Sequence, residues 1–202
     1  MPWTGSRNRG ANKLMKIALI VIAVLVVVLL AVGGQFISIR NDLVTRKESV
    51  TAAWSQVDVA LQRRADLIPN LVETVKGFAK HEEKAISDVA SARSALIGAK
   101  SPQQKIAANS QLDGALGRLL VVVENYPNLK ANENFLRLQD ELAGTENRIA
   151  VERRKYNETV QSYNTQIQLF PANVVASMSG FQREDAYFKT DPGARTAPKV
   201  AF

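Results

Sequence analysis

The sequence predicts an all-α protein, in which an N-terminal transmembrane helix precedes an antiparallel up-and-down four-helix bundle. Three observations predict it: an uncharged apolar run over residues 17–39, only three prolines between residues 40 and 170, and apolar residues recurring at helical spacings. The 202 residues suit one domain with appendages. The chain has no Cys, which excludes disulfides, thiolate metal sites and cysteine nucleophiles, and its single His disfavours a His-based triad.

The first predicted element is a membrane-spanning helix over residues 17–39. These 23 residues carry no charge, and a bilayer core of about 30 Å needs ~20 apolar residues in a helix. Residues 1–16 carry four basic and no acidic residues, so the positive-inside rule keeps this flank in the cytoplasm and sends the rest across. A cleaved signal peptide is the alternative, because Ala31-Val32-Gly33 resembles a cleavage site; the length of the apolar run favours a retained anchor.

Residues 40–170 are predicted to form the bundle, and its first helix continues from the span to Gly77, a C-capping glycine. The apolar stripe keeps its phase across Pro69, which therefore indicates a kink within one helix. We expect Trp54 on this stripe to be buried. The stripe consists of Leu43, Val50, Trp54, Val57, Leu61, Ile68, Leu71 and Val75.

Three further helices follow, at about residues 80–97, 102–125 and 129–169. Ser101-Pro102 is typical of a helix start, with a Ser N-cap and Pro at the first helical position. Gly144 in the last helix suggests close approach of another helix. Short loops make sequential helices antiparallel neighbours. Residues 171–202 are expected to form a partly disordered tail containing a short helix over residues 171–178.

Charged residues interrupt two of the stripes. Arg64 and Glu152 continue the apolar positions of the first and last helices, and we expect at least one to be ion-paired within the bundle. The alternative is that both side chains extend to the surface. The basic clusters Arg63-Arg64 and 153–155 have acidic neighbours and are interpreted as a solvated mixed-charge face. Much of the net charge of +7 lies in residues 1–16, so no nucleic-acid partner is predicted.

Several long segments resemble the LemA family of bacterial proteins, over about residues 17–190. They are AWSQVDV (53–59), RRADLIPNLVETVKG (63–77), ENYPNLKANENF (124–135), LQDELAGTENRI (138–149) and the Tyr-Asn pairs at 156–157 and 163–164. The resemblance implies a single N-terminal membrane span and a helical bundle, without assigned enzymatic activity, cofactor or catalytic residues. A branch of the family resembles proteins that help to build magnetosome membranes. Lys80 departs from the family pattern, which has a small residue or Pro there.

No catalytic, cofactor-binding or metal-ligating residues are predicted, nor a small-molecule substrate. His81 stands beside Glu82 and Glu83, but adjacent residues do not share a helix face, and a second His at zinc-site spacing is absent. These residues are better explained as the charged first turn of a helix. A hydrolase with paired carboxylates stays a remote alternative, because such a pair would need a cleft.

The sequence thus predicts a non-enzymatic, membrane-anchored scaffold or adaptor at the extracytoplasmic face of a bacterial inner membrane. Its expected partners are the lipid bilayer, through residues 17–39, and an unidentified protein or a second copy. The alternative is an oligomeric assembly that organises or shapes membrane. The candidate docking tip is Phe78, Tyr126, Asn128 and Asn132, where the turns at residues 77–81 and 126–132 should meet at the membrane-distal end. The competing interpretation is a purely structural turn, with Asn128 capping the last helix.

Overall fold

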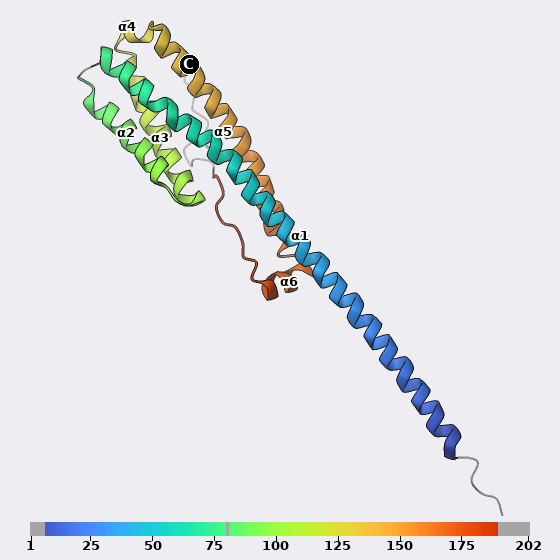
Figure 1. The fold of residues 1–202 in the computed structure, drawn as a ribbon. Helices are drawn as coiled ribbons and strands as arrows, with labels where there is room; N and C mark the ends of the chain where they lie inside the picture. Colours follow the sequence, from blue (N-terminus) through green and yellow to red (C-terminus); the bar gives the residue numbers. More distant parts are fainter. Residues whose placement is uncertain (1–6, 80, 190–202) are drawn as a thin grey trace, which may run out of the picture. The chain divides into compact units, whose positions relative to one another are not determined.

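The computed structural model describes residues 7–79 and 81–189, with side chains from residue 14 onward (Figure 1). The described residues contain helices and no strand, so the all-α prediction is confirmed. The helices are α1 (Arg7–Phe78), α2 (Glu83–Gly98), α3 (Pro102–Val123), α4 (Pro127–Lys130), α5 (Glu133–Gln166) and α6 (Ala172–Ser179). The expected flank at residues 1–6 and the expected disorder at residues 190–202 lie outside this range.

The chain forms two compact units. One comprises the residues up to Thr45 together with Gln166–Gln182, and the other comprises Arg46–Thr165 together with the residues from Arg183. The contacts therefore group part of the expected C-terminal tail with the bundle. The predicted boundaries at residues 40 and 170 stay a prediction, and each unit is described by itself.

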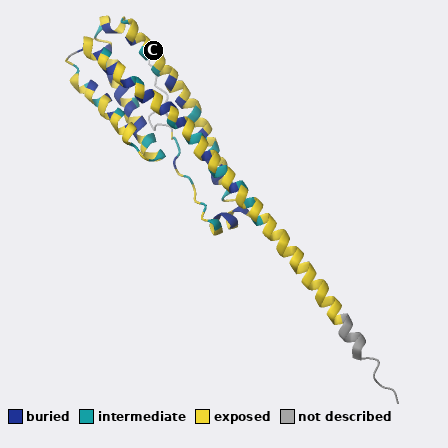
Figure 2. Ribbon diagram, viewed as in Figure 1, coloured by how far each residue is buried: buried dark blue, intermediate teal, exposed yellow. Residues whose placement is uncertain are grey.

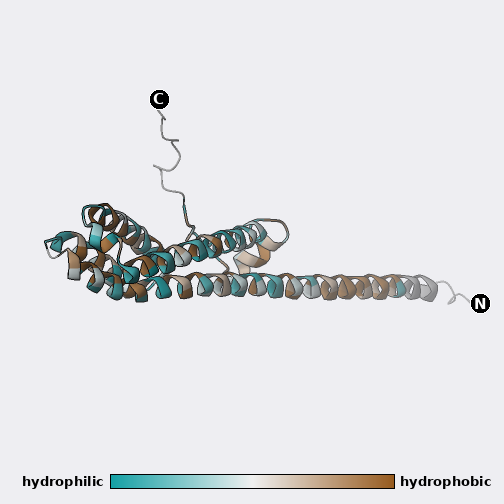
Figure 3. Cartoon of the chain, turned by 90° about the horizontal axis from the view of Figure 1, so that it is seen from above, coloured by the Kyte–Doolittle hydropathy of each residue, from teal (hydrophilic) through white to brown (hydrophobic). Residues whose placement is uncertain are grey.

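The first unit contains the apolar segment of α1, which is long and apolar enough to cross a membrane. Large aliphatic side chains from Leu14 to Val32 are exposed (Figures 2 and 3), as expected of a surface that faces lipid. Further along α1, Leu43 is buried against Val175 and Ala176 of α6. The partly buried side chains around this small core are Phe36, Ile39, Ile167 and Phe181.

The second unit is the helical bundle, in which α1 from Arg46 onward lies beside α2, α3 and α5 (Figure 1). Pro69 lies inside α1, as the uninterrupted stripe predicted. Figure 2 shows the buried residues facing the interior of this unit. The largest fully buried side chains of the bundle are Tyr156, Tyr163, Phe135, Leu61, Ile68, Leu71, Leu112, Leu119, Leu129, Ile149 and Val57.

The helix starts show one prediction that is confirmed and two that are corrected. Ser101 Oγ accepts a hydrogen bond from the Gln104 N–H at 3.2 Å, as expected of an N-cap. The second helix begins at Glu83 rather than near residue 80, and Lys80 lies outside the described residues. The last predicted helix is divided into α4 and α5. Asn128 is therefore not the cap of the long helix, because it lies within the short one.

Two packing predictions are also wrong. Trp54 is only partly buried, because one side of its large indole contacts Tyr156 and Phe188 while the rest reaches solvent. Gly144 does not mark a close helix approach, since a Cβ built there would meet no heavy atom within 4 Å. The apolar spacing locates both residues near the stripe, but it does not determine how closely the neighbouring helices approach them.

Candidate functional site

The predicted docking tip is assembled by a hydrogen bond between its two turns. The Tyr126 hydroxyl donates to Glu82 Oε1 at 3.0 Å, which connects the segment after α1 to the turn between α3 and α4. This bond, more than burial or the carboxylate charge, raises the pKa of Tyr126, because the carboxylate stabilises the protonated phenol. Phe78 is 42% exposed at the end of α1, and His81 is exposed nearby.

Most of the other polar groups at this tip stabilise its own turns. Asn132 Oδ1 accepts hydrogen bonds from the N–H groups of Asn134 and Phe135, at 3.0 and 3.1 Å, and so caps α5. Lys130 Nζ lies 2.5 Å from Glu124 Oε2. Asn128 is exposed on α4. The tip therefore presents Phe78 and Asn128 outward, whereas Tyr126 and Asn132 hold it together.

An ion pair between a buried arginine and a partly exposed aspartate crosses from α1 to α3. Arg64 is only 5% exposed, and its Nη1 lies 2.5 Å from Asp113 Oδ1 and 3.3 Å from Asn109 Oδ1. The expectation of a paired charge within the bundle is thus confirmed for Arg64. Glu152 instead pairs with Lys155 on the same helix, at 3.1 Å. The interpretation of Arg63-Arg64 as a wholly solvated cluster is wrong, because Arg64 points into the core.

A cavity of about 380 Å³ lies next to this pair, between α3 and α5. Its wall includes the carboxylates of Asp113, Asp140 and Glu146, and Asp113 is already paired with Arg64. Leucines from α3 and α5 form much of the remaining wall. Within the part of the chain that the structure describes, no group of three or more His, Cys, Asp or Glu residues could hold a metal ion.

The most extensively built site in the bundle holds a piece of the chain itself. We call residues 183–189 the tail segment and the place where they bind the tail-segment site. Asn164 Nδ2 donates to the Glu184 carbonyl at 2.7 Å, and the Glu184 N–H donates back to Asn164 Oδ1 at 2.9 Å. Asn157 forms the same pair of bonds with Phe188, at 2.8 and 3.0 Å. Each Asn thus satisfies both main-chain groups of one residue.

The two asparagines are spaced for a non-helical chain with one tight turn, in which the Tyr187 N–H donates to the Asp185 carbonyl at 2.9 Å. Asn157 and Asn164 are seven residues apart on α5, which is about 10.5 Å at 1.5 Å per residue. Glu184 and Phe188 are four residues apart, which is at most about 13 Å in an extended chain. Because Asn157 binds the later residue, the tail segment runs antiparallel to α5. Asn164 Nδ2 also lies 3.0 Å from the Tyr187 hydroxyl.

An aromatic pocket receives the side chain of Phe188. Its ring stacks on Trp54 of α1 with centroids 6.1 Å apart, and it meets Tyr156 of α5 edge-on at 6.0 Å. The Arg153 guanidinium carbon lies 4.6 Å from the centroid of the same ring, within range of a cation–π interaction. Arg153 is therefore not simply part of a solvated basic cluster. These contacts are made to the ring of Phe188, which is partly buried, whereas the asparagines contact main-chain groups.

Charge and burial complete the site. Lys47 Nζ lies 3.5 Å from Glu184 Oε2 and 5.4 Å from the centroid of the Tyr163 ring. Burial raises the pKa of both Tyr156 and Tyr163, and the nearby Glu184 carboxylate raises them further. The Tyr156 hydroxyl is buried without a hydrogen-bond partner among the described residues.

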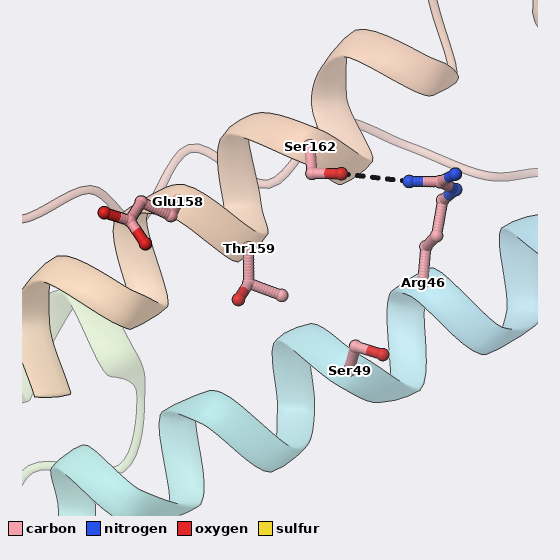
Figure 4. A pocket seen from close by; sticks show the side chains of 5 residues that line it. All are labelled: Arg46, Ser49, Glu158, Thr159 and Ser162. Carbon is pink, nitrogen blue, oxygen red and sulfur yellow. Dashed lines mark hydrogen bonds between the residues drawn. The ribbon is translucent and has the colours of Figure 1, made fainter.

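Helices α1 and α5 also enclose a polar pocket of about 290 Å³ (Figure 4). Arg46 Nη1 donates to Ser162 Oγ at 2.9 Å, and this hydrogen bond joins the two helices across the pocket. Ser49, Glu158 and Thr159 complete its lining. This pocket has no aromatic wall, and its polar groups come from side chains alone.

The sequence analysis missed the role of Asn157 and Asn164. The signal was present, because the Tyr-Asn pair repeats at a spacing of seven residues, which places both amides on one face of a helix. What the spacing could not reveal was the partner of these amides, since the tail segment lies 20 and 31 residues further along the chain.

The comparisons with known proteins agree with this architecture. The model of the LemA family matches residues 53–202, which include most of the bundle and the tail segment. The chain belongs to the LemA family. Its apolar α1 and its bacterial relatives identify a membrane-associated protein of LemA type.

Relatives of this LemA-family chain come from several bacteria. Magnetosome protein MamQ 2 of Paramagnetospirillum magneticum is 30% identical over 89% of this chain and 74% of its own length. Magnetosome protein MamQ of Magnetospirillum gryphiswaldense is 27% identical over 94% and 76%. Protein LemA of Metamycoplasma hominis is 28% identical over 70% and 65%. None of these names states an enzymatic activity.

Proposed function

We propose that this chain is a non-enzymatic scaffold or adaptor, anchored in the inner membrane with its bundle on the extracytoplasmic side. The continuity of α1 carries the proposal. One helix contains the apolar segment and also supplies Leu61, Ile68 and Val75 to the core of the bundle. An adaptor anchored in this way gains a high local concentration near other membrane proteins.

The proposed orientation rests on the basic residues that precede the apolar segment. A reporter that is active only in the periplasm, fused after Phe202, should be active. A reporter that is active only in the cytoplasm should be inactive at the same position. The opposite pattern would overturn the orientation, and release of a shortened chain from the membrane would indicate a cleaved signal peptide instead.

The docking tip is the proposed contact with a partner protein. Phe78 offers an exposed aromatic anchor and Asn128 an exposed hydrogen-bonding group, as at many binding hot spots. The test is crosslinking in intact membranes with the double variant Phe78→Ala/Asn128→Ala. We expect loss of a specific crosslinked partner with an unchanged melting temperature.

The matched control replaces a similar pair away from the tip. Val151 is 40% exposed and Asn147 is exposed, both in the middle of α5, so Val151→Ala/Asn147→Ala removes an apolar and an amide group away from the tip. The control should retain the crosslinked partner. If both double variants retain it, the tip is not the docking surface; if both lose it, the effect is not specific to the tip.

The second candidate function is a membrane-organising assembly of several copies. The names of the magnetosome relatives favour it, since a magnetosome protein is named for a membrane-associated structure. Sizing the detergent-solubilised protein distinguishes the two candidates. A monomer or dimer favours the adaptor, and a large closed assembly favours the organising role.

A further inference from the structure

We propose that the tail-segment site is a polypeptide-binding site that can be occupied by residues 183–189 of a second copy of this chain. The structure shows the segment seated in its own bundle. The geometry of the site points to a class of ligand: a non-helical chain with an aromatic side chain four residues after the first main-chain contact. A second copy provides this ligand with the same sequence.

The contacts make the site independent of covalent connection. Four hydrogen bonds from Asn157 and Asn164 engage main-chain groups, and the aromatic pocket engages Phe188. Lys47 pairs with Glu184 at the start of the segment. Every one of these contacts is noncovalent, so a segment from a neighbouring chain can make each of them unchanged.

The connection of the tail segment to its own bundle allows the exchange. It is joined to α5 through residues 167–182, and because α6 and Phe181 pack against Leu43, exchange requires the two copies to lie side by side in the membrane. Exchange of an identical element between copies replaces each contact by an equivalent one, so its free-energy difference depends mainly on effective concentration. Anchoring in a membrane raises the concentration of copies and favours exchange.

The exchange leads to a defined set of assemblies. Reciprocal exchange between two copies closes into a dimer, whereas one-way exchange links each chain to the next and leaves the assembly open. This goes beyond the proposed adaptor function, because an adaptor with every tail segment in its own bundle would still be anchored and could still dock at its tip. Failure of the exchange test therefore leaves the adaptor proposal in place.

The absence of native Cys makes a crosslinking test specific. Lys47→Cys is placed in one tagged full-length copy and Glu184→Cys in a differently tagged copy, and both are expressed together in the membrane. Their side chains form a partly exposed pair, so replacing them should leave the fold intact. A short bismaleimide should link the two tags at least several-fold more than in the control pair, Glu124→Cys with Glu184→Cys.

A third variant carries both Lys47→Cys and Glu184→Cys in one chain. Its internal crosslink measures how often the tail segment occupies the site of its own bundle. Adding Asn157→Ala/Asn164→Ala to the Lys47→Cys copy should abolish the intertag product. Crosslinks confined to the double-cysteine chain, with intertag product no greater than in the control pair, would overturn the exchange.

A binding measurement keeps the test decisive if the asparagine variants fold poorly. A fluorescent synthetic peptide of residues 183–189 is added to the full chain carrying Glu184→Pro/Phe188→Ala, whose own segment loses the Phe188 ring, the Glu184 N–H donor and the Lys47 pair and therefore competes weakly. We expect saturable binding, weakened at least tenfold when the peptide has Ala in place of Phe188. If the peptide does not bind, or binds equally well without its aromatic ring, the site does not accept a segment from another molecule.

Discussion

The docking tip and the tail-segment site both use asparagine amides, and they use them in opposite ways. At the tip, Asn132 bonds to N–H groups two and three residues further along. At the tail-segment site, Asn157 and Asn164 bond to main chain 31 and 20 residues away. The difference follows from position, because the N–H groups of the first turn of a helix are unsatisfied, whereas those further along are bonded within the helix. An asparagine beyond the first turn is therefore available to bind another segment.

The largest expected effect on stability comes from breaking the Arg64–Asp113 ion pair, which serves as a reference for the smaller effects expected at the docking tip and the tail-segment site. Asp113→Ala leaves the buried Arg64 without its charged partner and should lower the free energy of unfolding by about 3 kcal/mol. Asp88→Ala removes an exposed pair with Arg118 and should change it by less than about 1 kcal/mol. Chemical denaturation measures both, and equal effects would mean that Arg64 is solvated in solution.

Two phenylalanines, one in each region, should differ in how much their packing contributes to stability. Phe188→Ala should lower the free energy of unfolding by about 2–3 kcal/mol, since it empties the pocket formed by Trp54 and Tyr156. Phe78→Ala removes an exposed ring and should change it by less than about 1 kcal/mol. Thermal or urea unfolding monitors the difference. The comparison would break if Phe78→Ala proved the more destabilising of the two.

Two asparagines, one in each region, should differ in how much their hydrogen bonds contribute to stability. Asn164→Ala removes both bonds to Glu184 from a buried position and should destabilise by about 2 kcal/mol. Asn132→Ala removes an N-cap and should destabilise by about 1 kcal/mol. Limited proteolysis adds a qualitative distinction: Asn164→Ala should make residues 183–189 a cleavage site, and Asn132→Ala should not.

The smallest effect at neutral pH is expected for Tyr156→Phe. Its hydroxyl has no hydrogen-bond partner among the described residues, so the free energy of unfolding at pH 7 should change by no more than about 1 kcal/mol. At high pH the variant becomes informative. The pKa of Tyr156 is raised in the folded chain, so the folded state keeps its proton where the unfolded state has lost it.

The sign of the pH dependence follows. Stability should be constant with respect to this tyrosine below about pH 10, the ordinary tyrosine pKa, and should fall as the pH rises above it. Tyr156→Phe should therefore make the free energy of unfolding fall less steeply with rising pH. At the tip, Tyr126→Phe removes the hydrogen bond to Glu82. Unfolding curves at pH 7 and pH 11 provide the measurement. A decline of undiminished slope in Tyr156→Phe would show that this phenol is accessible to solvent.

The long helices, the Ser101 cap and the buried stripe could be predicted from the sequence because they depend on local spacing, whereas Gly77 lies inside α1 and does not cap it. Leu61, Ile68 and Val75 are buried where the spacing of α1 places them, and Ser101 caps α3 through a contact three residues long. Arg64 could be recognised as a charge on an apolar stripe. Its partner Asp113 could not, since that requires the register between α1 and α3.

The tail-segment site is the part that the sequence could least predict. Residues 183–189 have no helical periodicity and their main chain pairs with side chains of α5, so neither amphipathic pattern nor turn chemistry marks them. The docking tip stays a prediction. The structure shows that Tyr126 and Asn132 are engaged in closing its turns, whereas Phe78 and Asn128 are exposed.

Amide hydrogen exchange at two residues tests the central claim, that α5 holds the tail segment by its main chain. The N–H groups of Glu184 and Phe188 donate to Asn164 and Asn157, so both should exchange slowly in the native protein. In Asn157→Ala/Asn164→Ala both should exchange rapidly while the helices stay protected. Rapid exchange of both amides in the unaltered chain, at the rate of an unstructured peptide, would contradict the account.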